Sequence, residues 1–337
     1  MPLSRIKDRS LLQTGSYING QWVTTGRTFT VRDPGTGRAL AEICNAGAAE
    51  ARLAIDAAEA AFPAWRAQTA RVRSTVLRRW FELIEAHADD LATMITAEGG
   101  KPYAEGVSEV AYAASFVEWF SEEARRAYGE IVPANTSDKR ILVTREPVGV
   151  CAAITPWNFP AAMITRKVAP AIAVGCTAVV KPAEQTPITA LALAVLAARA
   201  GIPAGVFNVV TGDGDASIAI GSQLTGDARV RKLSFTGSTQ VGRLLMAQSA
   251  PTLKRLSMEL GGNAPFIVFE DADLDAAVTG AIACKFRNSG QVCVSVNRFL
   301  VHESVMDAFA EKLTAKVATL PVGYGFDKDV QVGPLRS

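Results

Sequence analysis

Short apolar runs alternate with longer amphipathic stretches through the middle of the chain. The pattern predicts strands at residues 148–154, 177–180, 206–210 and 232–235, and helices at residues 161–174, 188–200, 216–223 and 240–250. Strands without polar alternation are typical of sheets that are covered on both faces, and an alternation of strands with helices is typical of parallel sheets. This part of the chain therefore predicts a doubly wound parallel α/β sheet.

The N-terminal part begins with a hairpin signal and continues with helical periodicity. An Asn-Gly pair between β-forming residues predicts a tight hairpin at residues 17–23. Two helical stretches follow, and in the second the apolar residues Val76 and Trp80 recur four positions apart before a Gly-Gly-Lys-Pro stop at residues 99–102. A third helix is predicted at residues 105–127.

The alternation of strand and helix starts again after residue 260. Strands are predicted at residues 264–268 and 299–302, and helices at residues 274–287 and 303–320. A second α/β unit therefore begins in this part, and residue 337 is reached before a second full sheet is formed. A sheet that stops at this point is expected to leave an unpaired edge.

Composition excludes several classes of function. The 337 residues are 49% hydrophobic and carry a formal net charge of +2, with acidic and basic residues mixed along the chain. We expect neither a nucleic-acid partner nor a membrane span, and no secretory signal at the N-terminus. Five cysteines with irregular spacing indicate a reducing compartment, so the cytoplasm is expected. With two histidines and no Cys-x-x-Cys pair, no metal site is expected.

Three residues suggest covalent chemistry. Cys293 lies in a polar loop just after Gly290, where a thiol can be exposed and reactive, although a cysteine buried in apolar packing or an incidental one is the alternative. Glu259 stands between Met258 and Leu260 at a strand end, which predicts partial desolvation and a raised pKa, as a general base requires. Asn158 follows a strand in a proline-rich loop, from which its amide could donate to an oxyanion. An exposed glutamate and a rigid turn are the alternatives.

Two further segments suggest nucleotide binding. Lys181 and Glu184 follow a predicted strand, where a carboxylate and an ammonium can bind ribose hydroxyls. Residues 235–242 join a strand to a helix through glycines and hydroxyl side chains, which suits a pyrophosphate at the helix N-terminus. This is not the Gly-x-Gly-x-x-Gly fingerprint, and glycine-serine turns of this kind are also common without a ligand.

Together these segments resemble the aldehyde dehydrogenase superfamily from residue 17 to residue 334. The motifs that carry the resemblance are Pro156-Trp157-Asn158-Phe159-Pro160, Lys181-Pro182-Ala183-Glu184, Phe235-Thr236-Gly237-Ser238, Glu259-Leu260-Gly261-Gly262 and Gly290-Gln291-Val292-Cys293. The resemblance implies an α/β fold with a doubly wound cofactor domain and an incomplete α/β catalytic domain. It implies that Cys293 attacks an aldehyde, that Asn158 stabilises the oxyanion, and that Glu259 activates the water that hydrolyses a thioester.

The resemblance also implies a nicotinamide cofactor as hydride acceptor. The residues it places at the cofactor are Ile154, Thr155, Pro156, Trp157, Lys181, Glu184, Gly214, Phe235, Gly237, Ser238, Val241 and Leu260. Glu184 should repel the 2′-phosphate of NADP, and related enzymes with serine at this position tend to prefer NADP. NAD is therefore the expected cofactor in preference to NADP.

Within the superfamily, the succinate-semialdehyde dehydrogenase branch is most similar. Its substrate carries a carboxylate at the end opposite the aldehyde, and a guanidinium can bind that group through two hydrogen bonds. Arg166 and Arg287 match the substrate clamp of this branch, with surface ion pairs as the alternative. Glutarate semialdehyde would satisfy the same arginines. Ser295 stands where some relatives have a second cysteine, so a redox switch at that position is not expected.

The resemblance implies a division of the chain into functional parts. Residues 1–125 and 148–258 would form the dinucleotide-binding domain, residues 128–147 a projecting oligomerisation hairpin, and residues 259–337 the catalytic domain without its C-terminal part. A homo-oligomer is expected for the full-length enzyme. Two other functions stay open: a fragment that binds nucleotide without catalysis, and a cysteine esterase that needs no cofactor.

Overall fold

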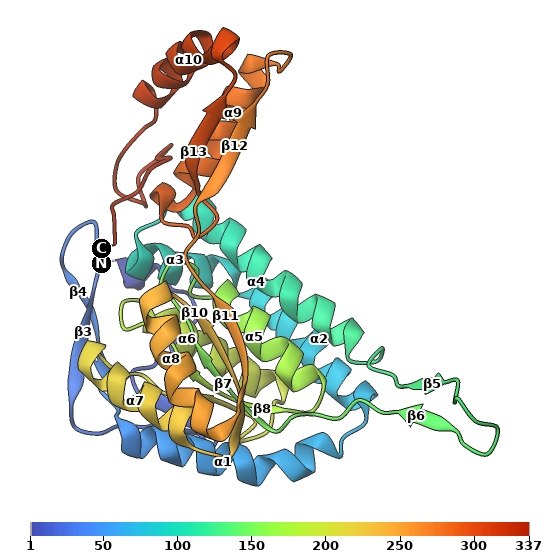
Figure 1. Ribbon diagram of the computed structural model, residues 1–337. Helices are drawn as coiled ribbons and strands as arrows, with labels where there is room; N and C mark the ends of the chain where they lie inside the picture. The colour runs from blue at the N-terminus through green and yellow to red at the C-terminus, as the bar shows by residue number, and fades with distance from the viewer. Residues whose placement is uncertain (1, 337) are drawn as a thin grey trace.

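A sheet of seven strands forms the centre of the computed structural model, which describes residues 2–336 (Figure 1). The strand order is β11-β10-β7-β8-β9-β1-β2. The parallel strands are β7 (Val150–Ile154), β8 (Thr177–Lys181), β9 (Phe207–Val209), β10 (Val230–Thr236) and β11 (Arg255–Glu259). The hairpin of β1 (Ser16–Ile18) and β2 (Gln21–Val23) adds an antiparallel edge. The predicted doubly wound sheet and the predicted hairpin are both confirmed.

Helices cover both faces of this sheet, which explains why its central strands are apolar without alternation (Figure 1). One face packs against α5 (Ala162–Ala173) and α6 (Pro187–Ala200), and α2 (Ala70–Ala86), α3 (Ala88–Gly99) and α4 (Tyr103–Glu123) pack on the outer side of these two helices. The other face packs against α1 (Ala48–Arg66), α7 (Gly214–Gly226) and α8 (Thr239–Ser249). Each layer encloses its own hydrophobic core.

The carboxyl ends of the parallel strands place several predicted site residues in one row. Ile154 at the end of β7 pairs with Lys181 of β8 on one side and with Phe235 of β10 on the other. Thr236 of β10 pairs in turn with Glu259 of β11. Because every one of these strands ends at the same edge, the loops that follow them converge there, where open α/β sheets bind ligands.

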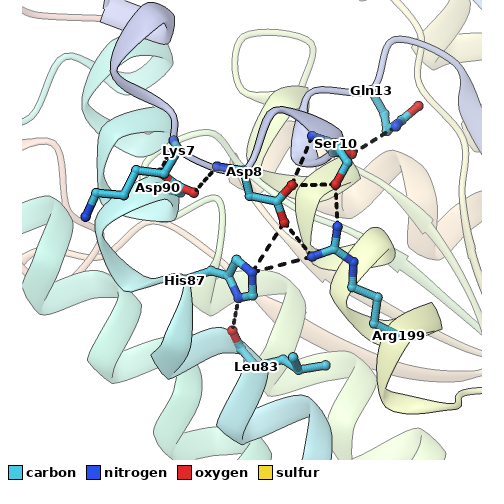
Figure 2. A network of polar contacts seen from close by, with 8 residues as sticks. All are labelled: Lys7, Asp8, Ser10, Gln13, Leu83, His87, Asp90 and Arg199. Atoms are coloured by element: carbon cyan, nitrogen blue, oxygen red, sulfur yellow. Dashed lines mark hydrogen bonds and ion pairs between the residues drawn. The ribbon is translucent and has the colours of Figure 1, made fainter.

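The second helical stretch of the N-terminal part is two helices, so its prediction as one helix was wrong. α2 ends and α3 begins at His87, whose backbone leaves the helical region at φ −109° and ψ 24°. Figure 2 shows the polar contacts at this break: the His87 ring lies 3.4 Å from a carboxylate oxygen of Asp8, which also binds Arg199 of α6 at 2.6 Å. The two backbone N–H groups of Lys7 and Asp8 donate to Asp90 in the first turn of α3. Long-range tertiary contacts therefore stabilise the break.

Two ribbons lie outside the main sheet. β3 (Thr28–Arg32) and β4 (Ala39–Cys44) pair antiparallel and were not predicted, because short strands with mixed polarity carry a weak periodic signal. β5 (Glu130–Val132) and β6 (Ile141–Val143) form a projecting ribbon in which every strand residue is exposed (Figure 1). This ribbon falls within the predicted oligomerisation hairpin, residues 128–147, whose partner stays a prediction.

A smaller unit follows the main sheet and stands apart from it in orange and red in Figure 1. β12 (Ala264–Val268) pairs in parallel with β13 (Val296–Val301), and α9 (Leu274–Phe286) and α10 (Met306–Ala318) accompany them. A small core holds the unit together, as predicted for a second α/β unit. Short 3-10 turns complete the described chain: η1 (Pro2–Arg5), η2 (Arg9–Leu11), η3 (Ala250–Thr252), η4 (Arg287–Gly290) and η5 (Glu303–Val305). Among residues 2–336, no helix has the length and apolar character needed to cross a membrane.

Candidate active site

A cavity of about 310 Å³ lies where the carboxyl edge of the main sheet meets the loop before β13. It brings together five residues that the sequence singled out from distant segments: Asn158, Arg166, Glu259, Arg287 and Cys293. The remaining lining residues are Tyr112, Pro156, Trp157, Phe159, Met163, Thr236, Gly237, Ser238, Leu260, Gly261, Val292 and Val294. A mostly apolar cavity with a few convergent polar groups is the usual form of a small-molecule site.

Cys293 projects from a loop whose backbone is unusually tight. Asn288, Ser289 and Gly290 have φ of 49°, 56° and 78° in succession, all in the left-handed region. The left-handed backbone thus includes Gly290 and the two residues before it. Cys293 is exposed and lines the cavity, so its thiol is accessible to a small molecule. The alternative of a thiol enclosed in apolar packing is wrong for Cys293.

Asn158 is attached to the cysteine loop through its side chain. Its Nδ2 donates to the backbone carbonyl of Gln291 at 2.9 Å. Its own backbone carbonyl accepts from Lys101 Nζ at 2.7 Å and from Asn288 Nδ2 at 3.2 Å. A carboxamide has two N–H donors, so one remains for a group in the cavity.

Glu259 ends β11, the outermost strand of the sheet, and lines the same cavity. Its side chain is exposed, so the prediction that Met258 and Leu260 would partly desolvate it was wrong. The reason is the position of β11: an edge strand has a neighbouring strand on one side only, and residues adjacent in sequence point to opposite faces. Glu259 is consequently open to water from the cavity side.

The two predicted clamp arginines enter the cavity from opposite elements. Arg166 comes from α5 and its guanidinium carbon lies 5.7 Å from the centroid of the Phe116 ring. Arg287 comes from η4 and lies 4.9 Å from the centroid of the Phe159 ring. Neither guanidinium has a carboxylate partner within ion-pair distance among residues 2–336, so the surface ion-pair alternative is not what the structure has. Both positive charges are available to an anion in the cavity.

A groove of about 490 Å³ adjoins the cavity along Pro156, Trp157 and residues 236–238. Its lining includes nearly all the residues predicted at the cofactor: Ile154, Thr155, Pro156, Trp157, Lys181, Glu184, Gly214, Phe235, Gly237, Ser238 and Val241. The twelfth predicted cofactor residue, Leu260, lines the cavity with Cys293 and does not line the groove. Leu260 packs closely on α8, because a Cβ added to Gly242 would lie only 2.7 Å from the end of its side chain.

The groove offers the polar groups that a dinucleotide needs. Lys181 Nζ is paired with Glu184 at 3.4 Å, and burial lowers the pKa of the Lys181 ammonium while Glu184 opposes that change. Ser238 caps α8 by accepting from Val241 N–H at 3.3 Å, and the first turn of a helix has N–H groups without helical partners. The buried hydroxyls of Thr155 and Thr236 have no hydrogen-bond partner among the described residues. The ribose diols, phosphates and amide of a dinucleotide could each form hydrogen bonds with these groups.

Several residues of this region were missed by the sequence interpretation. Tyr112, Phe159 and Met163 line the cavity, and Lys101 and Glu109 hold the loop that carries Asn158. Tyr112 and Met163 look like ordinary helix residues in sequence, and no local signal distinguishes them. The Gly-Gly-Lys-Pro stop at residues 99–102 could have drawn attention to Lys101, because a lysine at a helix end next to two special backbone residues is unusual.

Comparisons with known proteins agree on one family. Residues 22–337 match the model of the aldehyde dehydrogenase family. Two similar curated proteins are glutarate-semialdehyde dehydrogenase of Pseudomonas putida, 57% identical over 98% of this chain and 69% of its own length, and the succinate-semialdehyde dehydrogenase [NADP(+)] GabD of Escherichia coli, 56% identical over 98% and 68%. A crystal structure of succinate-semialdehyde dehydrogenase from Burkholderia pseudomallei superposes with a TM-score of 0.96 at 60% identity, over 98% of this chain and 69% of that one.

Proposed function

Because the chain belongs to the aldehyde dehydrogenase family, we propose that it oxidises a short aldehyde with a carboxylate at its far end to the corresponding acid. Succinate semialdehyde is the first candidate substrate and glutarate semialdehyde the second, after the names of the similar proteins. The observation that carries the proposal is the single cavity that joins Cys293, Asn158 and Glu259 to two unpaired arginines.

Each polar group of the cavity has a role in this reaction. The Cys293 thiol loses its proton to solvent, its sulfur adds to the aldehyde carbon, and the oxygen becomes an oxyanion that Asn158 Nδ2 and the Cys293 backbone N–H stabilise. A nicotinamide cofactor bound in the adjoining groove would supply the acceptor for the hydride that leaves this carbon. The product is a thioester on Cys293. Glu259 takes a proton from water, the resulting nucleophile displaces the Cys293 sulfur, and the acid is released.

The polar groups that line the groove support a dinucleotide as the cofactor. Lys181 and Glu184 would bind the adenosine ribose, and the N-terminus of α8 with Ser238 would bind the pyrophosphate. With Glu184 at the ribose, the 2′-phosphate of NADP would bring further negative charge close to its carboxylate. We therefore assign NAD as the preferred cofactor of this chain, although the Escherichia coli relative is named for NADP(+).

Replacement of Glu184 by serine is expected to reduce the preference for NAD over NADP. Removing one negative charge near the 2′ position should change the ratio of the two kcat/KM values by about tenfold. Steady-state kinetics with each cofactor at saturating aldehyde measure the ratio. Glu85→Ser, an exposed change on α2, is the matched control and should leave it unchanged. An unchanged ratio in Glu184→Ser would contradict the assignment of NAD.

The two arginines supply the selectivity for an anionic substrate. A substrate that places its aldehyde at Cys293 can extend its carboxylate toward Arg287 and Arg166, which line the same cavity. A guanidinium is planar and presents paired N–H donors that suit a carboxylate, and each of the two lies over an aromatic ring. An uncharged aldehyde of equal length gains nothing from these groups.

Arg287→Ala is the experiment that tests the proposed substrate class. The kcat/KM for succinate semialdehyde should fall about 10-fold to 100-fold, because one charge-assisted pair is lost. The kcat/KM for butanal, which has a methyl group in place of the carboxylate, should change little. Arg125→Ala, at an exposed position beyond α4, is the matched control. Equal losses for both aldehydes would show that Arg287 does not select the carboxylate. Equal kcat/KM values of the unchanged chain for both aldehydes would contradict the proposal of a carboxylated substrate.

The division of the chain follows from the same proposal. We assign residues 1–125 and 148–258 to cofactor binding and residues 259–337 to the catalytic part that contributes Cys293. The exposed β5–β6 ribbon, within residues 128–147, is assigned to contact between subunits.

A further inference from the structure

Lys101 and Glu109 form an ion pair that is almost completely buried. Their side chains are 1% and 0% exposed, and Nζ lies 2.5 Å from Oε2. Lys101 follows α3 in the connection to α4, and Glu109 lies on α4. Burying two charges is costly unless further hydrogen bonds satisfy them, so the remaining partners of the pair indicate its purpose.

Every remaining polar contact of the pair is to the segment that carries Asn158. Lys101 Nζ donates to the Asn158 carbonyl at 2.7 Å and lies 4.1 Å from the centroid of the Phe159 ring. Glu109 Oε1 accepts from the backbone N–H groups of Ala161 and Ala162, at 2.9 and 3.4 Å. The pair therefore holds the second half of the loop between β7 and α5, from Asn158 to the first residue of the helix.

The start of α5 explains part of this arrangement. Its N-cap is Ala161, which has no side-chain oxygen to accept from the first turn. Glu109 supplies that acceptor from another helix. Apart from Lys101, the donor to the Asn158 carbonyl among the described residues is Asn288 Nδ2.

Glu98 provides an internal comparison that isolates the role of the lysine. It caps α6 in the same way, accepting from Ile188 and Thr189 N–H at 2.7 and 2.9 Å, again where the helix lacks a side-chain cap. Glu98 has no lysine or arginine within ion-pair distance among residues 2–336, and burial raises its pKa to about 7, against the smaller opposing effect of Arg336 farther away. A buried carboxylate thus caps a helix here without a lysine. At Glu109, Lys101 adds a charge partner for the buried carboxylate and, in addition, the bond to the Asn158 carbonyl.

We propose that Lys101 and Glu109 are positioning residues that hold the Asn158 backbone so that its carboxamide points at the oxyanion formed on Cys293. The proposal rests on the proposed function, because it assumes that Asn158 stabilises that oxyanion. Lys101 touches neither the aldehyde nor the cofactor: it does not line the cavity or the groove. Its effect passes through the Asn158 carbonyl, while the Asn158 side chain stays bound to Gln291 of the cysteine loop.

The test is a double-mutant cycle between Lys101→Met and Asn158→Ala. Lys101→Met keeps the length of the side chain and should lower kcat about 100-fold, with the KM values for aldehyde and cofactor within about threefold, because only the oxyanion loses stabilisation. Asn158→Ala should have the same loss, and the double variant should lose no more than Asn158→Ala alone. Additive losses would mean that Lys101 acts by another route, and an unchanged kcat in Lys101→Met would overturn the proposal.

Controls separate positioning from folding. Asn208→Ala removes buried hydrogen bonds in β9 to the carbonyls of Ala178 and Gly205, far from the cavity, and should lower Tm without lowering kcat. If Lys101→Met does not fold, the neutral pair Lys101→Met with Glu109→Gln takes its place in the cycle, with the same expected loss of kcat. Recovery of full kcat in that folded pair would overturn the proposal.

A readout without cofactor distinguishes failure of this inference from failure of the proposed function. Calorimetry measures the reversible addition of succinate semialdehyde to the Cys293 thiol, which should be about 10-fold weaker in Lys101→Met than in the unchanged chain. If the unchanged chain neither adds nor oxidises the aldehyde, the proposed function fails and this inference fails with it. If it does both and Lys101→Met does both equally well, only the positioning role is wrong.

Discussion

Cys293→Ala is expected to abolish aldehyde oxidation. The thiol provides the covalent bond from which hydride leaves, and no other group in the cavity is a comparable nucleophile: the rest of its lining is carboxylate, amide, guanidinium, hydroxyl, thioether, aromatic or apolar. The loss of kcat should be on the order of 10⁴-fold or more, because the remaining residues bind and orient the aldehyde but cannot form the thioester. The appearance of reduced nicotinamide absorbance with succinate semialdehyde measures the rate.

Cys284→Ala is the matched control for this experiment. Cys284 is the other exposed cysteine among the described residues, and it lies on α9 outside the cavity. Its replacement should leave kcat and KM unchanged. Turnover by Cys293→Ala at a rate close to that of Cys284→Ala would refute the proposed covalent mechanism.

Glu259→Gln is expected to stop the reaction after the thioester has formed. Glutamine keeps the size of the side chain and its hydrogen bonding but cannot accept a proton from water. A single turnover of reduced nicotinamide should therefore appear, followed by a steady rate that is about 10²-fold to 10⁴-fold lower. Intact-mass measurement after mixing should detect the acyl group of succinate on Cys293.

Glu270→Gln is the corresponding control. Glu270 is another exposed carboxylate, beyond the end of β12, and does not line the cavity. The variant should turn over continuously at the rate of the unchanged chain. If Glu259→Gln shows neither the initial turnover nor the acyl adduct, the role of Glu259 lies before hydride transfer, and its assignment to thioester hydrolysis is wrong.

The Cys293 and Glu259 variants test separate halves of one reaction, and the two side chains reach the same cavity from different structural elements. Cys293 follows a loop with three consecutive left-handed residues, and Glu259 ends an edge strand of the main sheet. Left-handed backbone at residues other than glycine costs free energy and persists where surrounding contacts determine it. Asn288 has two such contacts: its N–H donates to Glu105 at 2.8 Å, and its amide donates to the Asn158 carbonyl.

Local pattern predicted the strands and helices well wherever the sheet dictates the local environment. Strands such as β7 and β8 are buried on both faces, so their apolar runs are uninterrupted and easily recognised. Patterns failed where distant contacts override them. The break at His87 depends on Asp8 and Arg199, and the exposure of Glu259 depends on β11 being the last strand of the sheet.

The order and chemistry of the motifs by themselves determined the family and the three residues proposed for covalent catalysis, since each motif is contained in a few consecutive residues. The alternation of apolar strands with amphipathic helices determined the parallel sheet. Only the tertiary structure could decide that Arg166 and Arg287 enter one cavity without carboxylate partners, and that Lys101 reaches Asn158 across 57 positions of sequence. The physical reason is that backbone propensity and apolar periodicity act between near neighbours, whereas burial, ion pairing and the convergence of loops are set by which strands lie side by side.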